Sequence, residues 1–197
     1  MFMVNKKEAL NVKTGAKAPV FFLLRRICLF VCCMLLIQGK TNAQNPSAYY
    51  VSSMQSTGIL YFVRPQTYFR NLNTNADLIM DVTYLNSRDS ATINFSYFDR
   101  ENINLETINI SYDSWQYQTD VKRIFVEMKK KQWHYRYTFD IPFEQLELFY
   151  KTNAPVISLA AGSRTINIQP IRRWRKNSEI NNLIIQIIQK NKTSIER

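Results

Sequence analysis

The sequence predicts a mainly β protein: an antiparallel β-sandwich, immunoglobulin-like or similar, with an amphipathic α-helix at its C-terminus. Three observations lead to this prediction. Apolar and polar residues alternate with a period of two over several stretches, as expected of strands that bury one face. Clusters of turn-forming residues separate these stretches. One long segment near the C-terminus instead repeats its aliphatic residues at helical spacing.

Three pairs of alternating stretches predict three β-hairpins. In the first, residues 78–84 and 93–97 flank the turn-forming residues 86–90. In the second, residues 124–128 and 133–141 flank a turn rich in lysine. In the third, residues 156–160 and 165–168 flank a turn around Gly162. Further strands are expected near residues 58–63 and 105–111.

Two segments predict helices. Residues 142–151 carry Phe143, Leu146 and Tyr150 at helical spacing, which predicts a short helix. The segment of about residues 177–191 predicts the C-terminal helix, because Asn177 or Ser178 can cap its start. We expect its apolar stripe to cover the sheet; the stripe consists of Ile180, Leu183, Ile184, Ile187 and Ile188.

The first 43 residues predict a secretory signal peptide. A basic segment precedes an uncharged apolar run from Ile27 to Ile37, which is shorter than the roughly 20 residues that span a bilayer. Small side chains at Thr41 and Ala43 predict cleavage between Ala43 and Gln44. We therefore expect export by the general secretory pathway to the periplasm or cell envelope, or secretion, with no transmembrane anchor after cleavage.

All three cysteines, Cys28, Cys32 and Cys33, lie in this predicted signal peptide. Residues 44–197 then form a single β-rich domain without cysteine. They carry 19 Lys and Arg against 14 Asp and Glu, so the net charge is +5, compared with +11 for the whole chain. Because export signals account for much of the positive charge, we do not expect a nucleic-acid partner.

The sequence offers little catalytic chemistry. His134 is the only histidine, and it alternates with apolar Trp133 and Tyr135. We therefore expect it on the outer, solvated face of a strand, with a general base as the alternative. One histidine and no cysteine cannot build a Cys/His zinc site. We assign no catalytic residue, and we expect neither a metal nor another cofactor.

Carboxylate pairs are the remaining basis for an enzyme. Asp99 and Glu101 follow a predicted strand, and Glu144 and Glu147 share one face of the short predicted helix. Hydrolysis of a glycosidic bond needs two carboxyl groups about 5–10 Å apart. The alternative function is therefore an exported hydrolase of envelope carbohydrate or peptide.

Two basic clusters are the candidate binding residues. The first is Arg172, Arg173, Trp174 and Arg175, which combines cations with an aromatic ring; the second is the lysine turn, Lys129, Lys130 and Lys131. Such clusters suit an anionic lipid surface, a polysaccharide or an acidic envelope protein. Trp174 has a structural alternative as an anchor between helix and sheet. The leading interpretation is a non-enzymatic binding or assembly module that uses a basic and aromatic surface.

Overall fold

The computed structural model describes residues 46–195, and the burial of side chains up to Asn191. The chain divides into two units, Met1–Ala43 and Gln44–Arg197, and the described residues belong to the second. The predicted signal peptide, its three cysteines and its cleavage bond lie outside the described residues. Cleavage between Ala43 and Gln44 therefore stays a prediction.

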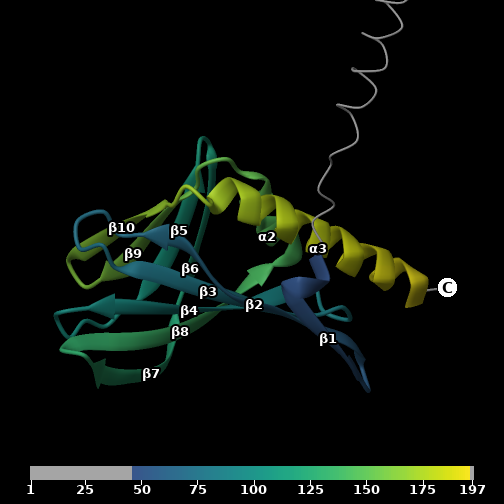
Figure 1. The fold of residues 1–197 in the computed structure, drawn as a ribbon, viewed down its shortest axis with the longest axis horizontal. Coiled ribbons are helices and arrows are strands. Elements are labelled where there is room, and N and C mark those ends of the chain that lie inside the picture. The colour runs from purple at the N-terminus through teal and green to yellow at the C-terminus, as the bar shows by residue number, and fades with distance from the viewer. Residues whose placement is uncertain (1–45, 196–197) are drawn as a thin grey trace, which may run out of the picture. The chain divides into compact units, whose positions relative to one another are not determined.

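Ten strands, two α-helices and one short 3-10 helix make up the described part of the chain (Figure 1). In chain order they are η1 (Pro46–Ala48), β1 (Tyr50–Gln55), β2 (Gly58–Arg70), β3 (Asp77–Leu85), β4 (Ser90–Asp99), β5 (Thr107–Tyr112), β6 (Trp115–Asp120), β7 (Lys122–Lys129), β8 (Gln132–Pro142), α2 (Phe143–Lys151), β9 (Val156–Ala161), β10 (Arg164–Pro170) and α3 (Trp174–Ile195). The predicted mainly β fold with a C-terminal helix is confirmed.

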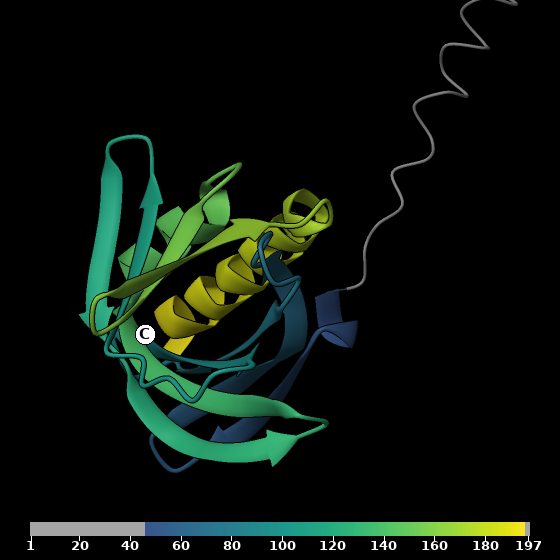
Figure 2. The same ribbon diagram turned by 90° about the vertical axis from the view of Figure 1, so that its left-hand side faces the viewer.

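All strand pairs are antiparallel, and the strand order is β6-β5-β9-β10-β2-β3-β4-β8-β7, with β1 paired to β2 beside this path. Two parts of the sheet meet at β10 and β2, where only two residue pairs join them: Gln169 with Arg70, and Pro170 with Phe69. This division is consistent with the predicted two-sheet arrangement. Figure 2 shows the sheet curving around α3.

The three predicted hairpins form as β3–β4, β7–β8 and β9–β10. Strands β1 and β6 were not predicted. In β1 only Tyr50 is partly buried, so this strand shows no alternation of buried and exposed residues. Strand β6 does alternate, with Trp115, Tyr117 and Thr119 half-buried, but it contains no aliphatic residue. The lysine turn is also tighter than predicted, because only Lys130 and Lys131 lie outside the strands.

The C-terminal helix is confirmed, but it begins at Trp174, three residues earlier than predicted. Asn177 and Ser178 therefore lie inside the helix, and the Ser178 hydroxyl donates a hydrogen bond to the Arg175 carbonyl (2.8 Å) rather than capping the start. The buried stripe also differs: Ile185 is buried, whereas Leu183 is exposed. Trp174 anchors the first turn in the core and so sets the face that α3 turns to the sheet.

The core lies between the inner face of the sheet and the two helices. The start of α3 packs into an aromatic cluster, where the Trp174 ring lies 4.8 Å from that of Phe69 and 5.1 Å from that of Phe149, measured between centroids. The Trp174 indole also donates a hydrogen bond to the Thr152 carbonyl (3.0 Å). Burial raises the pKa of the Tyr68 phenol beside this cluster, so it stays neutral. These contacts pack the start of α3 against β2.

Candidate functional site

A break in strand pairing along β2 creates the main candidate site. On the side away from β3, β1 pairs with residues up to Val63, and β10 pairs only with Phe69 and Arg70. Just beyond these pairs, the Arg64 N–H donates to the Tyr49 carbonyl and the Ile171 N–H donates to the Tyr68 carbonyl, each at 2.9 Å. Among the described residues, positions 65–67 are therefore the part of β2 left open on this side. Pro65 lies in this break and has no backbone N–H to donate to a neighbouring strand. The open edge leaves room for a pocket.

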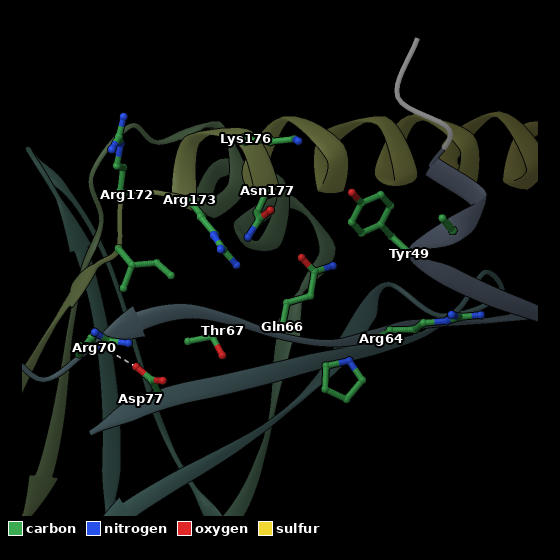
Figure 3. Close-up of a pocket in the computed structure, with 13 residues that line it drawn as sticks. Tyr49, Arg64, Gln66, Thr67, Arg70, Asp77, Arg172, Arg173, Lys176 and Asn177 are labelled. Atoms are coloured by element: carbon green, nitrogen blue, oxygen red, sulfur yellow. Dashed lines mark hydrogen bonds and ion pairs between the residues drawn. The ribbon is translucent and has the colours of Figure 1, made fainter. Parts of the chain in front are cut away.

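This basic pocket is open to solvent and has a volume of about 1080 Å³. It is lined by residues 48–49 at the end of η1, by the unpaired part of β2 with Arg70, by Asp77 at the start of β3, and by residues 171–177 at and before the start of α3. Figure 3 shows Arg173 and Asn177 pointing from the start of α3 towards Gln66 and Thr67 of β2. Arg64 and Arg172 lie towards opposite ends of the pocket (Figure 3). Arg173 thus points into the cavity, whereas Arg172 and Arg64 extend outwards at its two ends (Figure 3).

The basic pocket has a strong positive charge. Five cationic residues line it against a single carboxylate, Asp77; the cations are Arg64, Arg70, Arg172, Arg173 and Lys176. Asp77 pairs with Arg70 (2.6 Å between Oδ1 and Nε), and this hydrogen bond raises the pKa of Arg70. Within residues 46–195, no carboxylate forms an ion pair with the other four cations.

Neutral hydrogen-bonding groups complete the lining. Thr67, Asn177 and Tyr49 contribute a hydroxyl, an amide and a phenol. The Nε2 atom of Gln66 is buried and has no hydrogen-bond partner in the described part of the protein. A buried, unsatisfied donor costs about 1–3 kcal/mol. The positive end of the α3 dipole adds to the attraction for an anion.

The first predicted cluster divides between the pocket and the core. Arg172 and Arg173 line the pocket. Trp174 is only 2% exposed and lies in the core, which agrees with its structural alternative as an anchor. The Arg175 side chain is 85% exposed, lies outside the pocket lining and approaches Glu179 (3.8 Å). A ligand in the pocket could therefore contact Arg172 and Arg173 but neither Trp174 nor Arg175.

The second predicted binding cluster, the lysine turn, lies away from the basic pocket. Lys129 ends β7, and Lys130 and Lys131 form the turn to β8; none of the three lines the basic pocket. Because they lie apart from the basic pocket, we regard them as a separate surface.

Several pocket residues were not predicted as binding residues: Arg64, Gln66, Thr67, Arg70, Lys176 and Asn177. Most of them come from β2, far from α3 in the sequence. Pro65 within a long strand was the one local sign, because a proline in a strand marks an unpaired edge or a bulge. This proline indicates the gap in strand pairing along β2, but it does not indicate which residues from other elements line that gap.

His134 does lie on the outer face of β8, but it is not solvated as expected, because only 13% of its side chain is exposed. Its ring stacks on Phe98 of β4 at a centroid distance of 4.4 Å and meets Phe125 of β7 edge-on. Its Nδ1 atom lies 2.9 Å from a Glu127 oxygen. Cross-strand neighbours therefore cover both the ring and one nitrogen.

The carboxylate pairs favour structural roles. Asp99 and Glu101 do line one pocket of about 330 Å³. However, Arg164 donates to both, at 3.2 Å from Asp99 and 3.1 Å from Glu101, and so occupies the space between them. On α2, Glu147 accepts hydrogen bonds from Lys151 and Gln189. Neither arrangement leaves two carboxyl groups facing a substrate.

In the described part of the chain, three potential metal-ligating side chains do not come together anywhere. Within the same residues, no helix has both the length and the apolar character needed to cross a bilayer. Comparisons with known proteins find no significant match, whether to a family model, a curated protein or a solved structure, so the function must be argued from the basic pocket itself.

Proposed function

We propose that this protein is an exported, non-enzymatic binding module of the bacterial cell envelope, and that the basic pocket holds an anionic ligand. The observation that carries the proposal is the convergence of five cations on one cavity that contains a single carboxylate. Such a focus of positive charge attracts anions and raises their local concentration. The predicted signal peptide supports the location.

The ligand we propose is an acidic saccharide, bearing carboxylate or phosphate groups. A volume of about 1080 Å³ suits a short stretch of a sugar chain rather than a single small ion. The amides of Gln66 and Asn177 and the hydroxyl of Thr67 can bind sugar hydroxyl groups. The flat surface of a lipid bilayer would not reach Arg173, which points into the pocket (Figure 3).

The test compares two double variants with the same change in net charge. We expect Arg172→Glu/Arg173→Glu to weaken binding of polygalacturonate by at least about tenfold, because two pocket cations become anions. The matched control is Arg175→Glu/Lys130→Glu, whose side chains lie outside the pocket. This control should bind as the unmodified protein does. Binding is measured by calorimetry, with uncharged dextran as the neutral polymer.

Three results would overturn the proposal. Equal loss in both variants would show that only net charge matters, and no loss in either would show that the pocket is not used. Tighter binding to phosphatidylglycerol vesicles than to polygalacturonate, with the same dependence on Arg172 and Arg173, would make a lipid surface the ligand.

A further inference from the structure

Strand β7 is an open edge of the sheet that is exposed along its whole length. It pairs with β8 on one side and ends the strand order on the other, within residues 46–195. All eight of its residues are exposed. An edge of this kind presents unpaired backbone N–H and C=O groups to a further strand.

The apolar content of β7 is unusual for such an edge. Four of its residues are large and apolar, with exposed fractions of 37–57%: Ile124, Phe125, Val126 and Met128. Val126 and Met128 lie opposite Tyr135 and Trp133 of β8 and so extend the inner face of the sheet beyond the core. Their exposed surface would be removed from water if another chain covered it.

The opposite edge of the sheet behaves differently. In β6 the exposed positions are Gln116, Gln118 and Asp120, all polar. The two aromatic side chains of β6 are engaged, since Trp115 donates to Gln145 and Tyr117 donates to the Asp140 carbonyl. Exposed apolar residues thus distinguish β7 from β6, whereas the short edge strand β1 also exposes two of them, Val51 and Met54, without the positive charge that surrounds β7.

Positive charge surrounds the apolar part of β7. Residues 122–131 contain five cations and one acid; the cations are Lys122, Arg123, Lys129, Lys130 and Lys131. The acid, Glu127, lies 2.9 Å from His134 on the neighbouring strand. A second copy of this edge would bring two such positive segments together, whereas an acidic strand would be attracted.

The turn after β7 keeps two lysines at a conformational cost. Lys130 and Lys131 have φ angles of 52° and 63°, in the left-handed region. A two-residue hairpin turn with both φ angles positive favours Asn-Gly, because other side chains are strained there. The lysines are therefore poor turn residues, which suggests that their charge serves another purpose.

We propose that β7 binds an extended acidic segment of a partner protein, which adds to the sheet as a further strand. Backbone hydrogen bonds would form along residues 125–129, beyond the register shift that separates Arg123 from Phe125. Val126 and Met128 would contact apolar side chains of the segment. The lysines at the end of β7 would pair with its acidic residues. This surface is independent of the basic pocket.

The test uses a short synthetic peptide with alternating valine and threonine at its centre and glutamates at both ends. Added to the purified protein, it should slow amide hydrogen exchange along residues 125–129 by at least about tenfold. The same peptide with a central proline, which cannot continue the backbone pairing, should give much less protection. A version with lysines in place of the glutamates should bind at least about tenfold more weakly.

Charge reversal supplies the matched variants. Lys129→Glu/Lys131→Glu should weaken binding of the acidic peptide by about tenfold, whereas Arg172→Glu/Arg173→Glu should not. Protection outside β7, or equal binding of the acidic and basic peptides, would overturn the proposal. A dimer that protects β7 in the absence of peptide would overturn it too, because a second copy would then be the partner.

Discussion

The basic pocket and the lysine turn are both rich in positive charge, yet they are built in opposite ways. In the turn the three lysines are consecutive in sequence and lie at the end of an exposed hairpin. In the pocket the cations come from β2, from the linker after β10 and from α3, and they line a cavity. Only the second arrangement can contact one ligand from several sides. A binding pocket therefore depends on cations from different elements lining one cavity, and not on how many cations are consecutive in the sequence.

The two regions also differ in what supports them. The pocket wall begins next to Trp174, which is held among Phe69, Phe149 and the Thr152 carbonyl. The lysine turn has no buried residue, and all of β7 is exposed. The positions of Arg172 and Arg173 are therefore coupled to the core, whereas those of the lysines depend only on one hairpin.

The largest effect is expected for Trp174→Ala. Removing this buried ring should lower the free energy of unfolding by about 3–5 kcal/mol, because it leaves a cavity in the aromatic cluster. In the second region, Met128→Ala should cost less than about 1 kcal/mol, since Met128 is exposed. Urea denaturation measures both. Similar losses for the two variants would show that β7 is as much a part of the core as α3.

A smaller effect of opposite sign is expected at the lysine turn. Lys130→Asn/Lys131→Gly should raise the free energy of unfolding by about 1 kcal/mol, because both residues then tolerate positive φ. The same variant should bind the acidic peptide more weakly and polygalacturonate as before. If stability did not rise, the turn would not be strained, and that argument for the role of the lysines would fail.

The smallest effect is expected for Asp77→Asn. The change frees Arg70 and raises the net charge of the pocket, so polygalacturonate should bind about two- to fivefold more tightly. The control removes the acid of the other region: Glu127→Gln should leave polygalacturonate binding unchanged. Calorimetry at low salt measures both. Weaker binding of the Asp77→Asn variant would indicate that the carboxylate itself contacts the ligand.

Sequence patterns predicted the three hairpins and the C-terminal helix because these depend on local spacing. In β3 and β8 alternate residues are buried, for example Met80 and Val82, or Tyr135 and Tyr137. Residues two positions apart in a strand lie on the same face, so the alternation can be recognised in the sequence. Patterns failed for β1 and β6, which bury little. They also misplaced the start of α3, because Trp174 could be read either as a surface residue or as an anchor.

By itself, the sequence determined the class of fold, the hairpin partners and the presence of charge at residues 172–173. Only the tertiary structure decided that this charge meets Arg64, Arg70 and Lys176 across one cavity. The physical reason is range. Alternation and turn chemistry act over a few residues, whereas the pocket exists because β1 and β10 leave part of β2 unpaired and the core fixes α3 above it.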